Sequence, residues 1–228
     1  MFTNDPKVLG IAFLIGIIPS LFWLWFWLQE DKKNPEPTSV LGVVFLMGMI
    51  AVIFVIPIQK FIQANIVSSE MQLALWATAE EIVKYFAVVI VIYRTHLTDE
   101  PIDWPIYMIT GALGFAALEN ALFLIEPLSV GATAVGLLTG QLRFLGATLL
   151  HTVTSGIVGI SLGAAIHLDG FRKKVHLVFG LILAISLHSV FNFFIIRNNG
   201  SDFLKVFAFL WVVTIIVMLL FEKIRRMN

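Results

Sequence analysis

Residues 71–93 read MQLALWATAEEIVKYFAVVIVIY, an apolar run interrupted by Glu80, Glu81 and Lys84. A run of roughly 20 mostly apolar residues is long enough to cross a bilayer as a helix. Each charge near the bilayer centre costs about 2.5–3.5 kcal/mol on insertion scales, and such side chains normally face a bundle interior or a water-filled cavity. Lys84 follows Glu80 by four residues and Glu81 by three, so it can reach either carboxylate. The stretch therefore predicts a membrane-spanning helix with a functional polar face.

The composition of the whole chain points the same way. Hydrophobic residues make up 59% of the 228 residues and charged residues only 13%, whereas soluble domains carry roughly 25% charged residues. The net charge is zero and the sequence has no basic stripe, so nucleic-acid binding has no electrostatic support. The chain has no cysteine, which excludes disulfides and thiolate chemistry. The partner that composition does predict is the lipid bilayer.

Six further apolar runs have the length of a transmembrane helix: residues 8–28, 39–58, 105–125, 141–166, 177–196 and 203–221. No soluble domain fits between them. We therefore expect an all-α, polytopic membrane bundle of about seven transmembrane helices, forming one domain over residues 1–228 with a catalytic core at about 70–196. The stretch 127–140 is rich in Gly, Ser and Thr, and it predicts a loop or a re-entrant segment packed on protein.

Lys and Arg residues in the loops predict the orientation, because they are enriched on the cytoplasmic side. One side holds nine of them: Lys32, Lys33, Arg94, Arg172, Lys173, Lys174, Lys223, Arg225 and Arg226. The other side holds five: Lys7, Lys60, Arg143, Arg197 and Lys205. We expect a multi-pass protein of the cell membrane with its N-terminus outside and its C-terminus in the cytoplasm.

Three other predicted helices also carry polar side chains that are costly in lipid, namely Glu119, Asn120, Arg143, His151, His188 and Asn192. A purely structural interpretation exists for each: interhelical hydrogen bonds for the buried ones, and an interfacial position for Arg143. The remaining histidines lie in predicted loops and are assigned no role: His96, His167 and His176.

The heights of these residues favour a common site. A helix rises about 1.5 Å per residue, so the four costliest lie roughly 9–15 Å from the predicted outer ends of their helices: Glu80, Glu119, His151 and His188. Independent structural residues would scatter in height. A shared layer indicates one polar cavity in the outer half of the bilayer.

Such a set supports hydrolysis with water as the nucleophile. A glutamate can act as general base, while a histidine or Asn192 donates to the oxyanion. The same groups could instead bind catalytic zinc, with Glu80, Glu119, His151 and His188 as ligands. The familiar HExxH spacing is absent. We favour the metal-free interpretation, with no cofactor, and keep zinc as the alternative.

The ordered motifs resemble those of the PrsW family of bacterial membrane proteases. They are Glu80-Glu81-x-x-Lys84, Gly114-Phe115-Ala116-x-x-Glu119-Asn120, His151 in an Arg-led helix, and His188-x-x-Phe191-Asn192. The wider superfamily includes the CAAX prenyl endopeptidases, which carry His at the position similar to Glu119, and a scaffold subunit of γ-secretase. Glu119 favours the PrsW family.

The resemblance implies an intramembrane protease that cuts membrane-anchored proteins, anti-sigma factors among them, on the extracytoplasmic side as a first step in signalling. It gives Glu80 the water-activating role, and makes Glu81 with Lys84 an orienting pair, although the two glutamates could exchange roles. Glu119, His151, His188 and Asn192 would complete the site, supported by Asn120 and Arg143.

Two other functions stay open from the sequence. Intramembrane Glu and His residues also form ion pathways in proton-coupled transporters, although such transporters often show repeated halves and this chain shows no convincing repeat. A membrane scaffold without catalytic activity, as in the γ-secretase relative, is the other alternative. Substrate identity, cleavage position and oligomeric state are not encoded in any pattern found.

Overall fold

The computed structural model describes residues 5–31, 34–93, 95, 97–197 and 203–227. Lys32, Lys33 and Arg94, which contribute to the predicted charge asymmetry, lie outside the described residues, as does His96.

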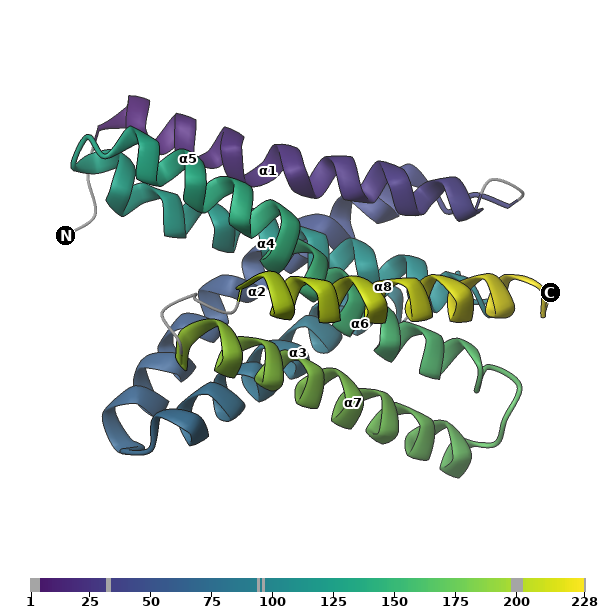
Figure 1. Ribbon diagram of the computed structural model, residues 1–228. Coiled ribbons are helices and arrows are strands. Elements are labelled where there is room, and N and C mark those ends of the chain that lie inside the picture. The colour runs from purple at the N-terminus through teal and green to yellow at the C-terminus, as the bar shows by residue number, and fades with distance from the viewer. Residues whose placement is uncertain (1–4, 32–33, 94, 96, 198–202, 228) are drawn as a thin grey trace.

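The described part of the chain is helical and contains no strand. The helices are α1 Pro6–Leu28, α2 Thr38–Asn65, α3 Ser69–Ile92, α4 Asp103–Ser129, α5 Thr133–Leu142, α6 Thr148–Gly163, α7 Gly170–Arg197 and α8 Phe203–Arg225. A π-helical segment, Arg143–Ala147, joins α5 to α6, so these two form one continuous helical length. Figure 1 shows α1 beginning at one end of the bundle and α8 ending at the opposite end, as seven crossings require. The predicted polytopic α-helical bundle is confirmed.

Six of the seven helical lengths are long and apolar enough to cross a membrane. The exception is α3, because Glu80, Glu81 and Lys84 lie in its middle. It nevertheless packs along α2 and α7 within the bundle. Its charges are therefore buried in protein, which is the arrangement that intramembrane charges require.

The prediction for residues 127–140 was wrong. Helix α4 continues through Pro127 to Ser129, and α5 begins at Thr133. Only residues 130–132 separate them, with Gly131 at a φ of 74°. Gly, Ser and Thr favour loops in water, but a chain in contact with lipid must satisfy its backbone hydrogen bonds internally, and that favours helix. Exposed Leu137 and Leu138 give α5 a lipid-facing side.

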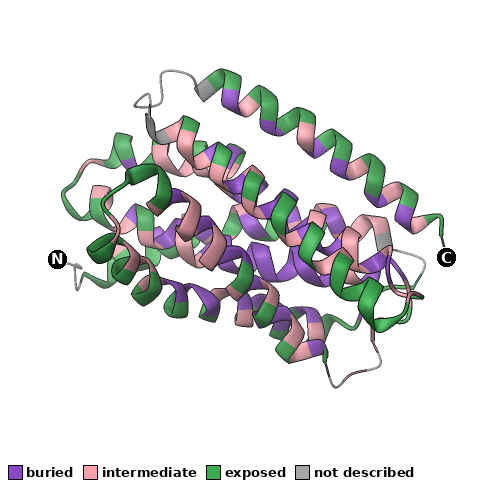
Figure 2. Ribbon diagram, turned by 90° about the horizontal axis from the view of Figure 1, so that it is seen from below, coloured by how far each residue is buried: buried purple, intermediate pink, exposed green. Residues whose placement is uncertain are grey.

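Helix α4 and the continuous length of α5 and α6 are the most buried of the six helical lengths that could span a membrane, and Figure 2 shows the buried residues gathered toward the middle of the bundle. Helix α4 packs against both α1 and α2, which needs close backbone approach. A Cβ added at Gly48 of α2 would lie 1.9 Å from the carbonyl oxygen of Gly111, and one at Gly114 would lie 1.9 Å from that of Phe45. The absence of a side chain at these glycines thus sets the α2–α4 separation, as small residues do in membrane bundles.

We expect Gly48→Ala to lower the free energy of unfolding by about 1–3 kcal/mol, the usual cost of overpacking, measured by SDS titration of the purified protein in mixed micelles. Gly42→Ala on the same helix is the matched control, because a Cβ there meets no atom within 4 Å. Equal stability of the two variants would show that α2 and α4 do not depend on this close approach.

Candidate active site

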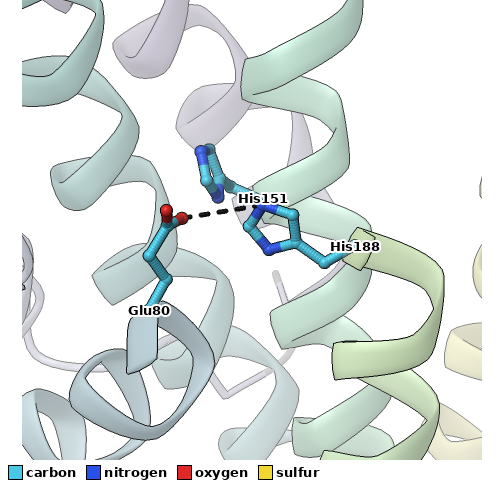
Figure 3. A group of neighbouring side chains, drawn as sticks. All are labelled: Glu80, His151 and His188. Carbon is cyan, nitrogen blue, oxygen red and sulfur yellow. Dashed lines mark ion pairs between the residues drawn. The ribbon is translucent and has the colours of Figure 1, made fainter. Parts of the chain in front are cut away.

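The predicted polar residues of α3, α4, α6 and α7 meet in the interior of the bundle. Glu80 and His151 are 4% and 2% exposed, and His188 is 2% exposed. Figure 3 shows these three side chains, from α3, α6 and α7, directed toward one another. Single ligand atoms of the three all lie within 4.8 Å of one another.

Glu81 and Lys84 form the most deeply buried ion pair of the site. Nζ of Lys84 lies 2.5 Å from Oε1 of Glu81, and both side chains are 0% exposed. The same carboxylate oxygen accepts hydrogen bonds from Nδ1 of His188 at 2.8 Å and from Oγ1 of Thr154 at 3.1 Å. Glu81 therefore fixes its neighbours through Oε1, while its Oε2 is buried and has no hydrogen-bond partner among the described residues.

Glu80 has a different environment from Glu81. Its Oε1 accepts a hydrogen bond from Nε2 of Gln59 at 2.8 Å. Its Oε2 is buried and has no hydrogen-bond partner among the described residues; the nearest ionisable group to it is Nε2 of His188, at 3.6 Å. One oxygen of Glu80 is thus held by protein, and the other is available for chemistry.

Glu119 anchors the opposite side of the site. Its Oε2 lies 3.0 Å from Nε2 of His151 and 2.5 Å from NH2 of Arg143. Nε of Arg143 also donates to Oδ1 of Asn120 at 2.6 Å, and Asn120 in turn donates to Thr148 at 2.8 Å. Arg143 sits at the start of the π-helical segment, a feature frequent at functional sites. It therefore ties α5 and α6 to α4 instead of extending to the head groups.

The hydrogen bonds also indicate where the histidine protons lie. Lys84 approaches Nδ1 of His151 at 3.1 Å. An ammonium group can only donate, so this Nδ1 accepts, and Nε2 carries the proton that is donated to Glu119. A carboxylate can only accept, so Nδ1 of His188 is protonated toward Glu81. Nε2 of His188 then presents a lone pair toward Glu80.

A cavity of about 820 Å³ opens onto these residues, within the size range of ligand sites. Glu80, Glu119, His151, His188 and Asn192 contribute to its lining. The rest is mainly apolar and comes from residues 52–63 of α2, 73–80 of α3 and 115–123 of α4, with parts of α5, α6, α7 and α8. These stretches lie toward the loops at 66–68 and 130–132, so the cavity occupies that half of the bundle.

Two participants were missed by sequence reasoning, Gln59 and Thr154. Threonine is common in membrane helices, and Gln59 lies near a helix end, where polar residues are ordinary. A signal for Gln59 does exist, because it continues the buried face of Val52 and Val55 at helical spacing. The height estimate for His151 used a wrong helix start, Gln141 instead of Thr133; the contacts, not the height, place this residue with the others.

Comparison with known proteins identifies the family of this chain. Residues 36–221 match the family model described as PrsW family intramembrane metalloprotease. The chain is 30% identical over 187 residues to Protease PrsW of Geobacillus kaustophilus, covering 81% of this chain and 79% of that protein. It is 29% identical over 209 residues to Protease PrsW of Oceanobacillus iheyensis, covering 88% and 91%. The corresponding protein of Bacillus subtilis is 26% identical over 201 residues, covering 86% and 88%.

No solved structure matches the chain. The relatives are named as proteases, which favours a peptidase over the transporter and the scaffold considered above. The described residues contain six apolar helices of spanning length, the family model matches residues 36–221, and the chain covers 79–91% of the relatives named above. This chain therefore belongs to the PrsW family and is a multi-pass intramembrane peptidase.

Proposed function

We propose that the chain hydrolyses a peptide bond of membrane-anchored proteins, anti-sigma-factor-like substrates among them, with Glu80 acting on the attacking water. The observation that carries this proposal is the buried Oε2 of Glu80, which has no hydrogen-bond partner among the described residues and lies 3.6 Å from Nε2 of His188. Oε2 of Glu81 is also unpartnered, but Glu80 lines the cavity and Glu81 does not. A carboxylate oxygen kept free of protein donors in a cavity that a peptide can enter is suited to accept a proton from water.

The residues have distinct roles in the proposed reaction. Glu80 takes a proton as the water oxygen attacks the peptide carbonyl carbon, and it delivers that proton to the departing amine when the C–N bond breaks. The amide of Asn192, which lines the cavity, is the candidate donor to the developing oxyanion. Glu81 and Lys84 orient His188 and His151 by hydrogen bonds.

The family description implies a metal, and the donor set fits one. Glu80, His151 and His188 would hold it, as two histidines and one glutamate hold zinc in other peptidases. Glu119 lies outside this group of three, and it is engaged by Arg143.

Two further observations support the fit of a metal to these residues. Glu81 contacts Nδ1 of His188 in the way that carboxylates orient metal-binding histidines. Among the described residues of the site, the three carboxylates of Glu80, Glu81 and Glu119 face two permanent cations, the buried Lys84 and the partly buried Arg143. When bound, the metal would supply an activated water and polarise the substrate carbonyl.

These observations favour the metal-assisted form, in which Glu80 would be a ligand; the proton transfer to Glu80 belongs to the metal-free form. We expect a chelator to lower cleavage by at least about tenfold, since Lewis-acid assistance contributes several kcal/mol, and added zinc to restore it. Metal analysis of the purified protein is the second measurement, and His188→Ala should lower the bound zinc. Full activity of protein stripped of metal would instead assign water activation to Glu80 alone.

The substrate would be cut on the extracytoplasmic side. The cavity lies toward the loops at 66–68 and 130–132, and the positive-inside rule places these loops outside. This orientation, with the N-terminus outside and the C-terminus cytoplasmic, gives the enzyme the position of a first cleavage in signalling across the membrane.

A single-pass reporter with a different tag on each side of its membrane segment tests the proposal in liposomes. We expect the parent enzyme to release the extracytoplasmic tag, with the cut position read by mass spectrometry. Glu80→Gln, Glu119→Gln, His151→Ala and His188→Ala should each reduce release. Full cleavage by all four variants alongside an active parent would place the chemistry elsewhere.

A further inference from the structure

Gln59 of α2 contacts the site from outside the predicted catalytic core of residues 70–196. Its Nε2 donates to Oε1 of Glu80 at 2.8 Å. The carboxylate can only accept, so the amide nitrogen, not the amide oxygen, must face it. Val55 precedes Gln59 by four residues and Val52 by seven, and both valines are buried, so the amide extends the inward face of α2 into the cavity.

The backbone at Gln59 is fixed as well as its side chain. Nε1 of Trp76 donates to the carbonyl oxygen of Gln59 at 3.2 Å. Trp76 precedes Glu80 by four residues on α3, so the two share one helix face. Pro57, two residues before Gln59, cannot donate a helical hydrogen bond. Both the side chain and the backbone carbonyl of Gln59 are thus hydrogen-bonded to the Glu80 face of α3. These contacts follow directly after Pro57, where α2 lacks one backbone hydrogen bond.

These contacts have a consequence for the two oxygens of Glu80. With Oε1 held by Gln59, Oε2 remains unpartnered and lies 3.6 Å from Nε2 of His188. We infer that Gln59 is a positioning residue that sets the orientation of the Glu80 carboxylate and keeps Oε2 directed toward the two histidines. This inference rests on the proposed role of Glu80. A neutral donor suits the task, because it holds the carboxylate without adding a neutralising charge.

Gln59→Met tests the inference, because it keeps the length of the side chain and removes the donor. We expect kcat to fall about 10- to 100-fold, the usual effect of losing a group that orients an active-site residue, while KM changes little because the methionine keeps the bulk of the side chain in the cavity lining. Gln141→Met is the matched control. Gln141 is exposed on α5 and does not line the cavity, so both constants should match those of the parent.

A second measurement tests the contact between Gln59 and Glu80 and does not depend on enzyme activity. Gln59→Glu places two carboxylates together and should lower the melting temperature in detergent. Adding Glu80→Gln recreates an amide–carboxylate hydrogen bond in the reverse direction, so the double variant should regain the melting temperature while remaining inactive. This recovery is not expected if the two side chains are apart.

The outcomes separate the inference from the proposed function. If the parent cleaves the reporter and Gln59→Met retains its kcat, Gln59 does not position Glu80, although the protease assignment stands. If the parent does not cleave, the proposed function fails, and the melting temperatures still decide whether Gln59 and Glu80 are in contact. Failure of Glu80→Gln to restore the melting temperature of Gln59→Glu would overturn the inference in either case.

Discussion

Glu80→Gln is expected to reduce kcat by about 10²- to 10⁴-fold, the contribution of a positioned general base. The amide that replaces the carboxylate has nearly the same shape, but it cannot accept a proton from water. Oε2 of Glu80 has no hydrogen-bond partner among the described residues, and Glu80, unlike Glu81, lines the cavity, so the substitution removes the oxygen that would accept the proton or hold a metal and leaves the packing of α3 nearly unchanged. The rate of reporter cleavage in liposomes is the measurement.

Glu126→Gln is the control for this substitution, because Glu126 is exposed near the end of α4 and does not line the cavity. It should cleave at the parent rate. Circular dichroism should give the same helix content for both variants. A parent-like kcat for Glu80→Gln would show that Glu80 takes no part in the reaction and would leave Glu81 as the candidate base.

Lys84→Met is expected to produce the largest loss of stability, about 3–5 kcal/mol in the free energy of unfolding, as when one partner of a buried ion pair is removed. The ammonium is fully buried and contacts both Glu81 and His151. Its removal leaves the Glu81 carboxylate in the interior without a cation. The measurement is SDS titration in mixed micelles, read by circular dichroism.

The double variant Lys84→Met/Glu81→Gln tests the cause of that loss. Replacing both partners of a buried pair by neutral groups is often close to neutral for stability, so the double variant should recover most of the lost free energy without regaining cleavage. Lys60→Met, at an exposed lysine of α2, should change stability by no more than about 0.5 kcal/mol. If Lys84→Met unfolds like the parent, the buried pair does not contribute to the stability of the bundle.

The extent of α5 shows where local sequence was misleading. Residues 133–142 contain glycines and threonines that predict a break, yet they form a helix that continues through the π-helical segment into α6. The preference of these residues for loops is weak and local, whereas the need of backbone groups in lipid to bond internally applies to the whole segment. Loop preferences that hold for soluble proteins therefore led to a predicted helix start at 141, eight residues after the observed start at 133.

The sequence by itself determined that this protein is a membrane-embedded helical bundle with several ionisable residues inside it, because the transfer cost of each residue into lipid depends on local composition alone. It also supplied the family resemblance, through the order and spacing of the motifs. These features are properties of single segments, and they need no knowledge of which helices are neighbours.

Only the tertiary structure decided how the ionisable groups divide their contacts. On an isolated helix Lys84 reaches Glu80 and Glu81 equally well, because spacings of three and four residues are both adjacent. In the folded bundle Lys84 binds Glu81, His188 and Thr154 bind the same oxygen, and Gln59 takes one oxygen of Glu80. The choice depends on where α2, α6 and α7 place their donors, and those positions follow from helix packing across the whole chain.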